Sequence, residues 1–228
     1  MVVKLAKQLV PPLENGDRLT RDEFVRRYEA MPASVKAELV NGVVYMASPV
    51  RLAAHGEPTA NLIAWMTYYK AHTPGTRGGD NSTVRLDKKN EMQPDACLLI
   101  DPSHGGRCQI DAHDYIIAAP ELVVEVSASS TSYDLHEKLE AYRDFGAPEY
   151  LVWRVFDQAI DWFVLRGGNY KRFARDREGI LKSKIFPGLW LDPTALIRDD
   201  LRKVFRVLKR GLASPEHAAF LKRLSAKS

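Results

Sequence analysis

Long apolar runs and a serine-hydrolase motif are missing from this sequence of 228 residues, and we expect no signal peptide. No apolar run approaches the roughly 18 residues that a membrane helix requires, so we expect no membrane-spanning segment. The first residues, MVVKLAKQLVPP, include a short apolar stretch but no long hydrophobic region and no small-residue cleavage site. The absence of a G-x-S-x-G motif disfavours a serine hydrolase.

Cysteine is scarce as well, because Cys97 and Cys108 are the only two and they form no CxxC pair. A zinc site is therefore not expected. Cys97 lies inside an apolar run, which predicts a small core residue. Reduced thiols and the missing signal peptide together predict a cytoplasmic protein.

Charge is distributed unevenly along the chain. The segment from Arg198 to Ser228 has nine lysines and arginines against three acids, which gives it a net charge of +6. The whole chain has a net charge of +4, so residues 1–197 together carry about −2. These basic residues have two interpretations: contact with phosphate groups, or the exposed side of an amphipathic helix that docks on the body or on another subunit. We favour docking, because an apolar stripe follows helical spacing at Leu201, Val204, Phe205 and Leu208.

Hydrophobic periodicity and turn signals predict an α+β fold, a mixed sheet with flanking helices. We expect helices over 20–30, 52–71 and 134–145 and two more after residue 198, and strands over 36–47 (a hairpin), 82–86, 95–100, 121–126, 149–155, 159–165 and 170–173. A capping box at Thr20–Glu23 begins the first helix, and Asn41-Gly42 is a hairpin turn signal. Residues 74–80 and 101–114 are expected to be loops.

One carboxylate stands out in the stretch PELVVEVS. Glu125 interrupts an apolar strand, and burying a lone ionised carboxylate costs several kcal/mol unless it is paired or bound to a metal. Asp95 begins another apolar strand, in QPDACLLI, and two neighbouring strands can bring both carboxylates to one end of a sheet. Such oxygen ligands suit Mg²⁺ or Mn²⁺, which can activate water for phosphodiester hydrolysis.

Two further residues are candidates for the same site. Lys138 shares a helical face with Leu135, Leu139 and Tyr142, and a lysine rarely points into a core without a partner. Its ammonium could neutralise the two carboxylates, position the attacking water or stabilise charge in the transition state. Glu38 is a fourth candidate, because it begins a hairpin strand that is otherwise apolar.

These residues resemble the PD-(D/E)XK nuclease superfamily and, more narrowly, the Uma2 family of restriction-endonuclease-like proteins, also known as the domain of unknown function DUF820. The resemblance rests on ELVNGVVYMASP, His55 in the next helix, MQPDACLLI and PELVVEVSASSTSYDLHEKLEAYRDFGAPEYLVW, and it covers roughly Glu23 to Leu191. It implies a restriction-endonuclease-like αβββαβ core within residues 19–197, between a lead-in over 1–18 and a basic helical extension over 198–228.

The resemblance also implies roles for residues. Asp95 and Glu125 would coordinate Mg²⁺ or Mn²⁺, Glu38 would act as an auxiliary acid, and His55 is expected beside the metal ligands. The superfamily pattern E-x-K is broken here, since Ser127 stands in the place of the lysine; Lys138 is the substitute.

The implied activity is a metal-dependent endonuclease that hydrolyses phosphodiester bonds in DNA. A homodimer would suit this activity, because double-strand cleavage needs two sites and the terminal helices carry apolar residues. Two other functions stay open. The chain could be a non-catalytic nuclease-fold module that binds nucleic acid or a protein partner, with Glu125 and Lys138 as a buried ion pair. It could also hydrolyse another phosphate ester, because a fold does not fix a function.

Overall fold

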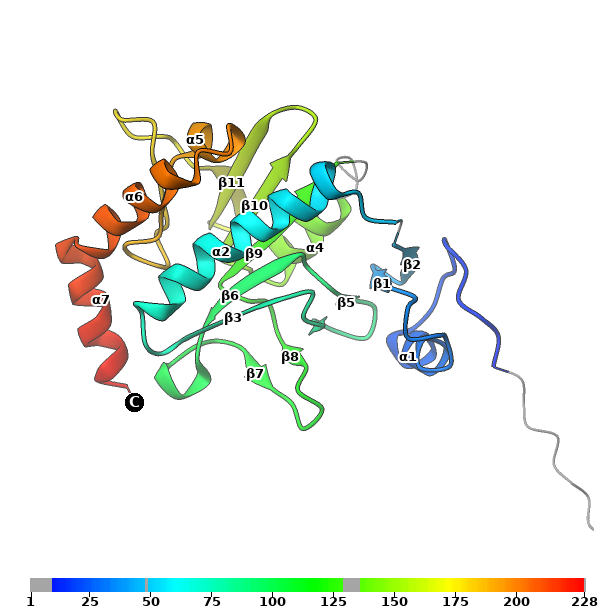
Figure 1. Cartoon of the computed structure of the whole chain (residues 1–228). Coiled ribbons are helices and arrows are strands. Elements are labelled where there is room, and N and C mark those ends of the chain that lie inside the picture. Colours follow the sequence, from blue (N-terminus) through cyan, green and yellow to red (C-terminus); the bar gives the residue numbers. More distant parts are fainter. Residues whose placement is uncertain (1–9, 48, 129–135, 228) are drawn as a thin grey trace, which may run out of the picture.

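The computed structural model describes residues 10–47, 49–128 and 136–227. Within these ranges the strands form two six-stranded sheets and a two-stranded ribbon, with helices packed against them (Figure 1). This is the mixed α+β architecture that the sequence predicts, although the strands divide between two sheets. None of the helices in the described ranges combines the length and the apolarity needed to cross a bilayer.

The first sheet, called the central sheet below, carries the strand that contains Glu125. Its strands, in spatial order, are β12 (Asn169–Arg172), β11 (Ala159–Arg166), β10 (Glu149–Arg154), β9 (Leu122–Ser127), β6 (Ala96–Ile100) and β3 (Thr76–Asp80). Only β9 and β10 run parallel to each other. A parallel pair needs a crossover connection, and here the chain crosses through α4 (Glu137–Asp144).

The second sheet, called the side sheet, is built from shorter strands. They are, in spatial order, β2 (Val43–Met46), β1 (Ala37–Val40), β5 (Glu91–Met92), β4 (Val84–Arg85), β8 (Ile116–Ile117) and β7 (Gln109–Ile110). Asn41 and Gly42 connect β1 to β2 with φ of 52° and 79°, the positive values that a type I′ turn requires. The structure therefore confirms this predicted hairpin. The separate ribbon pairs β13 (Leu181–Lys182) with β14 (Trp190–Leu191).

The helices begin largely where the sequence signals place them. They are α1 (Arg21–Tyr28), a π-helical turn (Leu52–Gly56) that leads into α2 (Glu57–Ala71), a 3-10 turn (Pro102–His104), α5 (Pro193–Ile197), α6 (Leu201–Leu212) and α7 (Pro215–Ser225). The Thr20 hydroxyl accepts a hydrogen bond from the Glu23 N–H at the start of α1, as the capping box predicts. Ser214 caps α7 by accepting from the His217 N–H.

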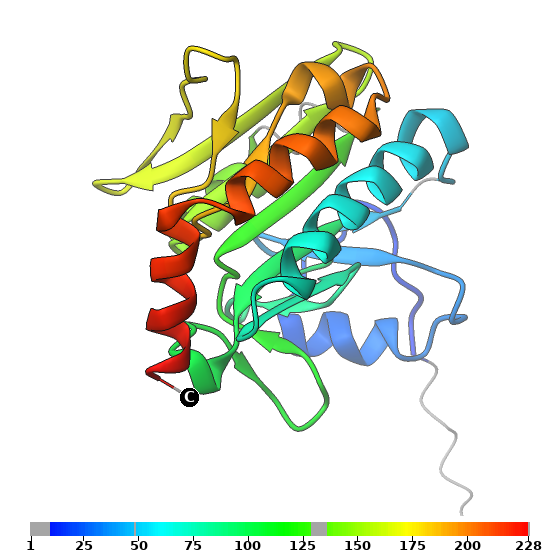
Figure 2. The same ribbon diagram turned by 60° about the vertical axis from the view of Figure 1, so that its left-hand side comes forward.

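Both faces of the central sheet are covered, which explains why all six residues of β9 are buried. On one face lie α2, α6 and α7, with α2 and α6 side by side in two views (Figures 1 and 2), and Trp65 of α2 meets Trp162 of β11 edge to face at 5.8 Å. On the other face α4 and the side sheet pack Tyr142 and Met92 against Val123 and Tyr150.

The basic C-terminal segment belongs to this core. Its apolar stripe is buried against the central sheet and α2, with exposures of 2% or less at Val204, Leu208, Phe220 and Leu224. Burying such a side chain contributes about 1.5–3 kcal/mol. The docking interpretation of the amphipathic helix is therefore confirmed, and the charged side of α6 stays outside.

Some local predictions were wrong. Residues 74–80 were expected to be a loop, but Thr76–Asp80 form the edge strand β3, paired antiparallel with β6. Its two glycines gave no strand signal; a Cβ at Gly78 would lie 3.1 Å from the carbonyl oxygen of Cys97, so this close pairing suits a residue without a side chain. Glu91 and Met92 form β5, a short strand that was not among the expected strands. Of the helix expected over 134–145, residues 134 and 135, including Leu135, lie outside the described residues.

Cys97 is the core residue that the sequence predicts. Its side chain lies in β6 with 1% exposure, and burial raises its pKa to about 12. A thiol with so high a pKa is protonated near neutral pH and a poor nucleophile.

Glu149 is a fully buried carboxylate that the sequence did not single out. It begins β10, and its oxygens accept hydrogen bonds from the Ser183 hydroxyl at 2.8 Å, the Lys184 N–H at 2.7 Å and the Ile185 N–H at 3.2 Å. Burial nevertheless dominates and raises the pKa of Glu149 to about 7. Between pH 4.5 and 7 the folded state therefore holds a proton that the unfolded state has lost.

This difference predicts how stability depends on pH. The contribution of Glu149 is largest below pH 4.5 and is lost as the pH rises to about 7, by up to about 3 kcal/mol at 1.36 kcal/mol per pKa unit. In Glu149→Gln, which resembles the protonated acid, this loss should vanish. Urea unfolding of both proteins from pH 4.5 to 8 measures it as the difference between two curves; parallel curves would contradict the prediction.

Candidate functional site

The two carboxylates that the sequence singles out lie at one end of the central sheet. Strands β6 and β9 are antiparallel neighbours, with Ala96 opposite Val124 and Cys97 opposite Val123. Continuing this register by one residue sets Asp95 opposite Glu125. Directly opposed residues of an antiparallel pair have Cβ atoms about 4.5–5.5 Å apart, so the two side chains begin close together.

Asp95 is held on both sides. Its Oδ2 accepts a hydrogen bond from the Val126 N–H at 2.7 Å, next to Glu125 in β9. Its Oδ1 lies 3.1 Å from Nε2 of His55, in the π-helical turn before α2. Nδ1 of His55 lies 3.2 Å from the Thr59 hydroxyl, so the neutral tautomer with its hydrogen on Nε2 satisfies both contacts. These contacts fix the orientation of the Asp95 carboxylate.

Lys138 lies between two other carboxylates. Its Nζ is 3.0 Å from Oε1 of Glu125 and 2.8 Å from Oε2 of Glu38. The side chains of Lys138 and Glu125 are only 6% and 4% exposed, and that of Glu38 is 17% exposed. The other oxygen of Glu38 accepts from the Gln93 N–H at 2.6 Å, which ties β1 to the residue before Pro94 and Asp95.

The crossover helix explains how a lysine reaches this position. Lys138, Ala141 and Tyr142 form the buried side of α4, which packs against the central sheet beside Val123 and Tyr150. Gly146 ends the helix region in the left-handed conformation, with φ of 73°, so the chain turns directly into β10. The parallel pairing of β9 with β10 therefore determines where the ammonium lies.

Tyr142 adds a feature that the sequence did not reveal. Its ring packs on the ring of Tyr150, with the two centres 5.6 Å apart. Its hydroxyl, however, is buried without a hydrogen-bond partner among the described residues. Burial and then the charge of Glu125 raise the pKa of Tyr142 well above its usual range. The one available signal was its spacing, four residues after Lys138 on the same helical face.

The charge of this cluster favours a cation. At full ionisation Asp95, Glu125 and Glu38 carry −3, and the ammonium of Lys138 compensates only +1. Carboxylate oxygens are the ligands that Mg²⁺ and Mn²⁺ prefer, so the donor set of Asp95 and Glu125 fits such a metal. As the described side chains lie, no three His, Cys, Asp or Glu residues are arranged to hold a metal ion, and Lys138 stands between two of the carboxylates.

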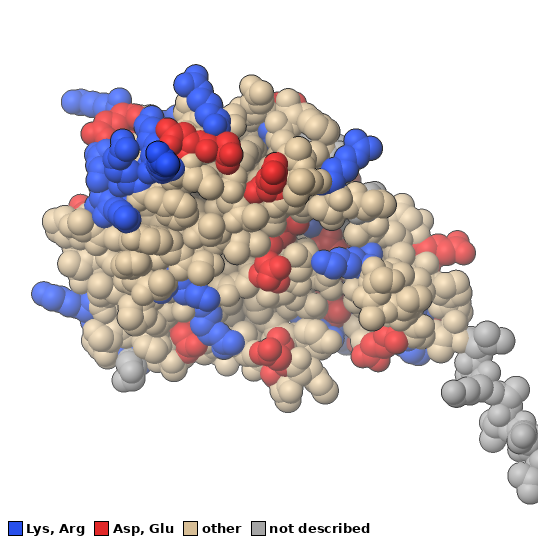
Figure 3. Space-filling view, viewed as in Figure 1, with Lys and Arg blue, Asp and Glu red and all other residues tan. Residues whose placement is uncertain are grey.

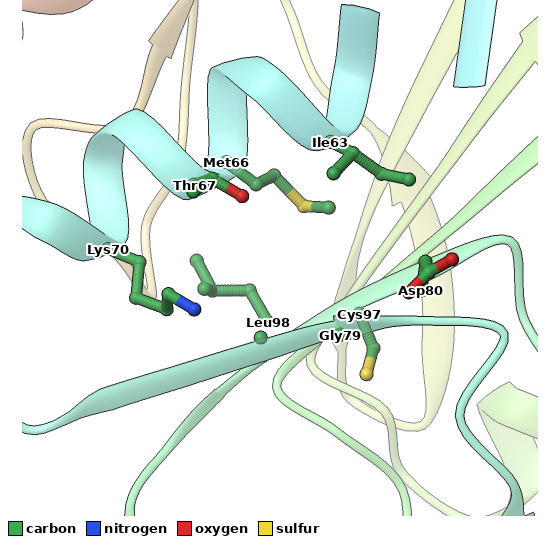
Figure 4. Close-up of a pocket in the computed structure, with 9 residues that line it drawn as sticks. Ile63, Met66, Thr67, Lys70, Gly79, Asp80, Cys97 and Leu98 are labelled. Carbon is green, nitrogen blue, oxygen red and sulfur yellow. The ribbon is translucent and has the colours of Figure 1, made fainter. Parts of the chain in front are cut away.

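A separate cavity of about 130 Å³ lies between α2 and the strands β3 and β6 (Figure 4). Its lining is mainly apolar, with Lys70 and Asp80 toward opposite ends of the close-up. None of the carboxylates around Lys138 lines it. The cavity is thus distinct from the carboxylate cluster.

Comparisons with known proteins agree with this architecture. The model of the Uma2 family, described as "Putative restriction endonuclease", matches residues 21–194. The structure is similar to a crystal structure of "a putative nuclease belonging to DUF820" from Anabaena variabilis ATCC 29413, with a TM-score of 0.60 and 15% identity over 78% of this chain and 99% of that chain. Among curated proteins none matches significantly. At this identity the crystal structure shows a shared fold.

The buried ion pair can be tested by its energetics. Lys138→Met should destabilise the protein by about 3 kcal/mol, because it removes a cation that lies 3.0 Å from the buried carboxylate of Glu125. Adding Glu125→Gln should recover part of that loss, so that the two changes couple by about 2 kcal/mol in a double-mutant cycle of unfolding free energies.

The exposed pair Arg210–Glu178, whose atoms are 2.7 Å apart, is the matched control. Its cycle should give a coupling below about 0.5 kcal/mol. Equal coupling in the two cycles would show that burial of Lys138 and Glu125 adds nothing.

Proposed function

We propose, from the premise that this chain belongs to the Uma2 family, that it is a metal-dependent endonuclease that hydrolyses phosphodiester bonds in DNA. The observation that carries the proposal is the placement of Asp95 just before β6, where the register of β6 with β9 continues to Glu125, with Lys138 bonded to Glu125. Hydrolysis of a phosphodiester needs an activated water and compensation of negative charge, and this cluster has groups for both.

Asp95 and Glu125 are the residues that would hold a Mg²⁺ or Mn²⁺ ion. When bound, the metal supplies Lewis-acid polarisation and positive charge at the phosphate. His55 and the Val126 N–H keep the Asp95 carboxylate in a fixed orientation, which reduces the reorganisation that binding requires. Through its contact with Asp95, His55 has a positioning role.

Lys138 replaces the lysine that the E-x-K pattern would place at Ser127. Because it comes from α4 and not from β9, its ammonium reaches Glu125 from the neighbouring helix and is held there by Glu38 as well. An approaching phosphate brings negative charge, and a preorganised ammonium in a buried site stabilises that charge strongly. Glu38 acts as the auxiliary acid that keeps Lys138 in place.

A second function is favoured by one specific observation. Lys138 already satisfies Glu38 and Glu125 at 2.8 and 3.0 Å, which is the arrangement expected of a structural ion-pair network. In a non-catalytic nuclease-fold module the same residues would neutralise one another and the surface would bind nucleic acid or a protein. Metal binding distinguishes the two functions.

Cleavage of plasmid DNA tests the endonuclease directly. We expect purified protein to nick or linearise plasmid in Mg²⁺ or Mn²⁺ but not in EDTA. Asp95→Asn should lower the rate at least 100-fold, equivalent to about 2.7 kcal/mol, because it removes a ligand charge. The matched control Asp22→Asn, on an exposed carboxylate of α1, should cleave as the unaltered protein does. Undiminished cleavage by Asp95→Asn would refute the site.

The dependence of the melting temperature on metal distinguishes the nuclease from the non-catalytic nuclease-fold module. A metal at ten times its Kd adds about 1.4 kcal/mol to the folded state, which should raise Tm by about 3 °C for a domain of this size. Asp95→Asn should abolish the rise while Asp22→Asn keeps it. If millimolar Mg²⁺ and Mn²⁺ leave Tm unchanged in the unaltered protein, the module function is the better account.

A further inference from the structure

An open groove of about 570 Å³ lies between α2 and α6, away from the carboxylate cluster. It is lined by Tyr68, Arg202, Phe205, Arg206 and Lys209. The two helices lie side by side in both views (Figures 1 and 2). In the space-filling view, lysine and arginine side chains gather with some acids at the upper left, where Figure 1 draws α6 (Figure 3).

The three cations that line the groove are uncompensated. Arg202, Arg206 and Lys209 are exposed and have no carboxylate in ion-pair range within the described part of the chain. Two other cations of α6 are paired: Lys203 with Asp192 at 2.8 Å and Arg210 with Glu178 at 2.7 Å. The helix thus concentrates its unpaired positive charge along the groove.

The spacing of these charges is regular. Positions 202, 206 and 209 follow the i, i+4, i+7 pattern of one helical face, and they extend over about 10 Å at 1.5 Å per residue. A nucleic acid strand carries a phosphate about every 3.4 Å of its axis. About three phosphates would therefore fit along the row.

The floor of the groove is aromatic. The rings of Tyr68 and Phe205 lie 5.5 Å apart, and Lys209 Nζ is 5.8 Å from the centre of the Tyr68 ring. His72 stacks on Tyr68 at 4.5 Å and covers part of that ring. Both floor residues are half-buried rather than protruding, which suits contact with sugars beneath a row of phosphates better than insertion into a lipid surface.

Helix α2 connects the groove to the carboxylate cluster. His55, which contacts Asp95, directly precedes α2, and Tyr68 lies thirteen residues further along, or about 20 Å. Asn61, between them, donates a hydrogen bond at 2.9 Å to Asp199, which lies just before α6. A strand of about six nucleotides spans that distance.

We propose that the groove of Arg202, Arg206 and Lys209 over Tyr68 and Phe205 binds the sugar–phosphate backbone of the DNA substrate, about six nucleotides from the bond that is cleaved and without regard to sequence. The distance to the cleaved bond rests on the proposed function, whereas the binding surface can be tested without catalysis. The apolar side of α6 docks in the core while its cationic side binds the substrate.

Binding in EDTA tests the groove, because no cleavage is needed. The probes are fluorescein-labelled 30-nucleotide single strands and 30-base-pair duplexes of two unrelated sequences, titrated by anisotropy between 50 and 200 mM salt. The groove variant is Arg202→Gln, Arg206→Gln, Lys209→Gln. Losing about three phosphate contacts should reduce the slope of log K against log salt by about 2–3 and weaken binding at least tenfold at 100 mM salt, equally for both sequences.

The control variant removes the same charge elsewhere. Lys88→Gln, Lys89→Gln, Lys171→Gln changes three exposed lysines away from the groove and should alter affinity less than twofold. Equal losses of affinity in the groove and control variants would show that only net charge matters. A loss of affinity for only one of the two sequences would indicate base readout. Either result overturns the proposal. So would undetectable binding to every probe. Weakened binding of the groove variant to phosphatidylserine vesicles, with DNA binding unchanged, would assign the groove to a membrane surface.

The two proposals fail in different ways. Binding that depends on the groove, together with absent cleavage in Mg²⁺ and Mn²⁺, would refute the endonuclease and keep the binding surface. Cleavage that Asp95→Asn abolishes, together with unchanged binding by the groove variant, would keep the endonuclease and refute the groove.

Discussion

A lysine held between two carboxylates inside the protein is the interaction on which the rest of this structure depends. An ammonium and carboxylates can be buried together only if each compensates the desolvation of the other. Lys138, Glu125 and Glu38 do so with contacts of 2.8 and 3.0 Å, and each comes from a different element: α4, β9 and β1. The cluster thus joins the central sheet, the side sheet and the crossover helix at one point.

The fold positions this cluster through one topological choice. Because β9 and β10 are parallel, the chain must cross over between them, and α4 brings Lys138 back toward β9. Antiparallel pairing of β6 with β9 then brings Asp95 to the same edge. Three carboxylates and one lysine meet here among the described residues, and this gathering of oxygen ligands is the physical reason to expect a divalent cation at this edge.

Much of this arrangement can be predicted from sequence, and the reasons differ by residue. Glu125 is conspicuous because a charge in an apolar run needs a partner, and Lys138 because it lies on an apolar helical face. The Asn41-Gly42 hairpin and the Thr20 cap follow from local rules that tertiary context does not override. The family resemblance added the αβββαβ core and the expectation that Asp95 is a metal ligand, which spacing alone left open.

Other features follow from contacts that no local pattern encodes. The strand β3 forms from a glycine-containing segment because β6 offers it a backbone ladder. The Tyr142 hydroxyl, which has no hydrogen-bond partner within the described ranges, and the three donors around Glu149 depend on which distant segments fold against them. In the basic segment the sequence left docking and phosphate contact as alternatives. The docked stripe uses one side of α6, and the cationic side that adjoins it at Phe205 is exposed and available for the other role.

The most direct test of the central claim is anomalous diffraction from crystals soaked in Mn²⁺, collected for the unaltered protein and for Asp95→Asn. The account predicts one strong anomalous peak about 2.2 Å from carboxylate oxygens of Asp95 and Glu125 in the unaltered protein and none in the variant. An unaltered protein without that peak, with Lys138 still bonded to Glu125 and Glu38, would contradict it and identify the cluster as a structural ion-pair network.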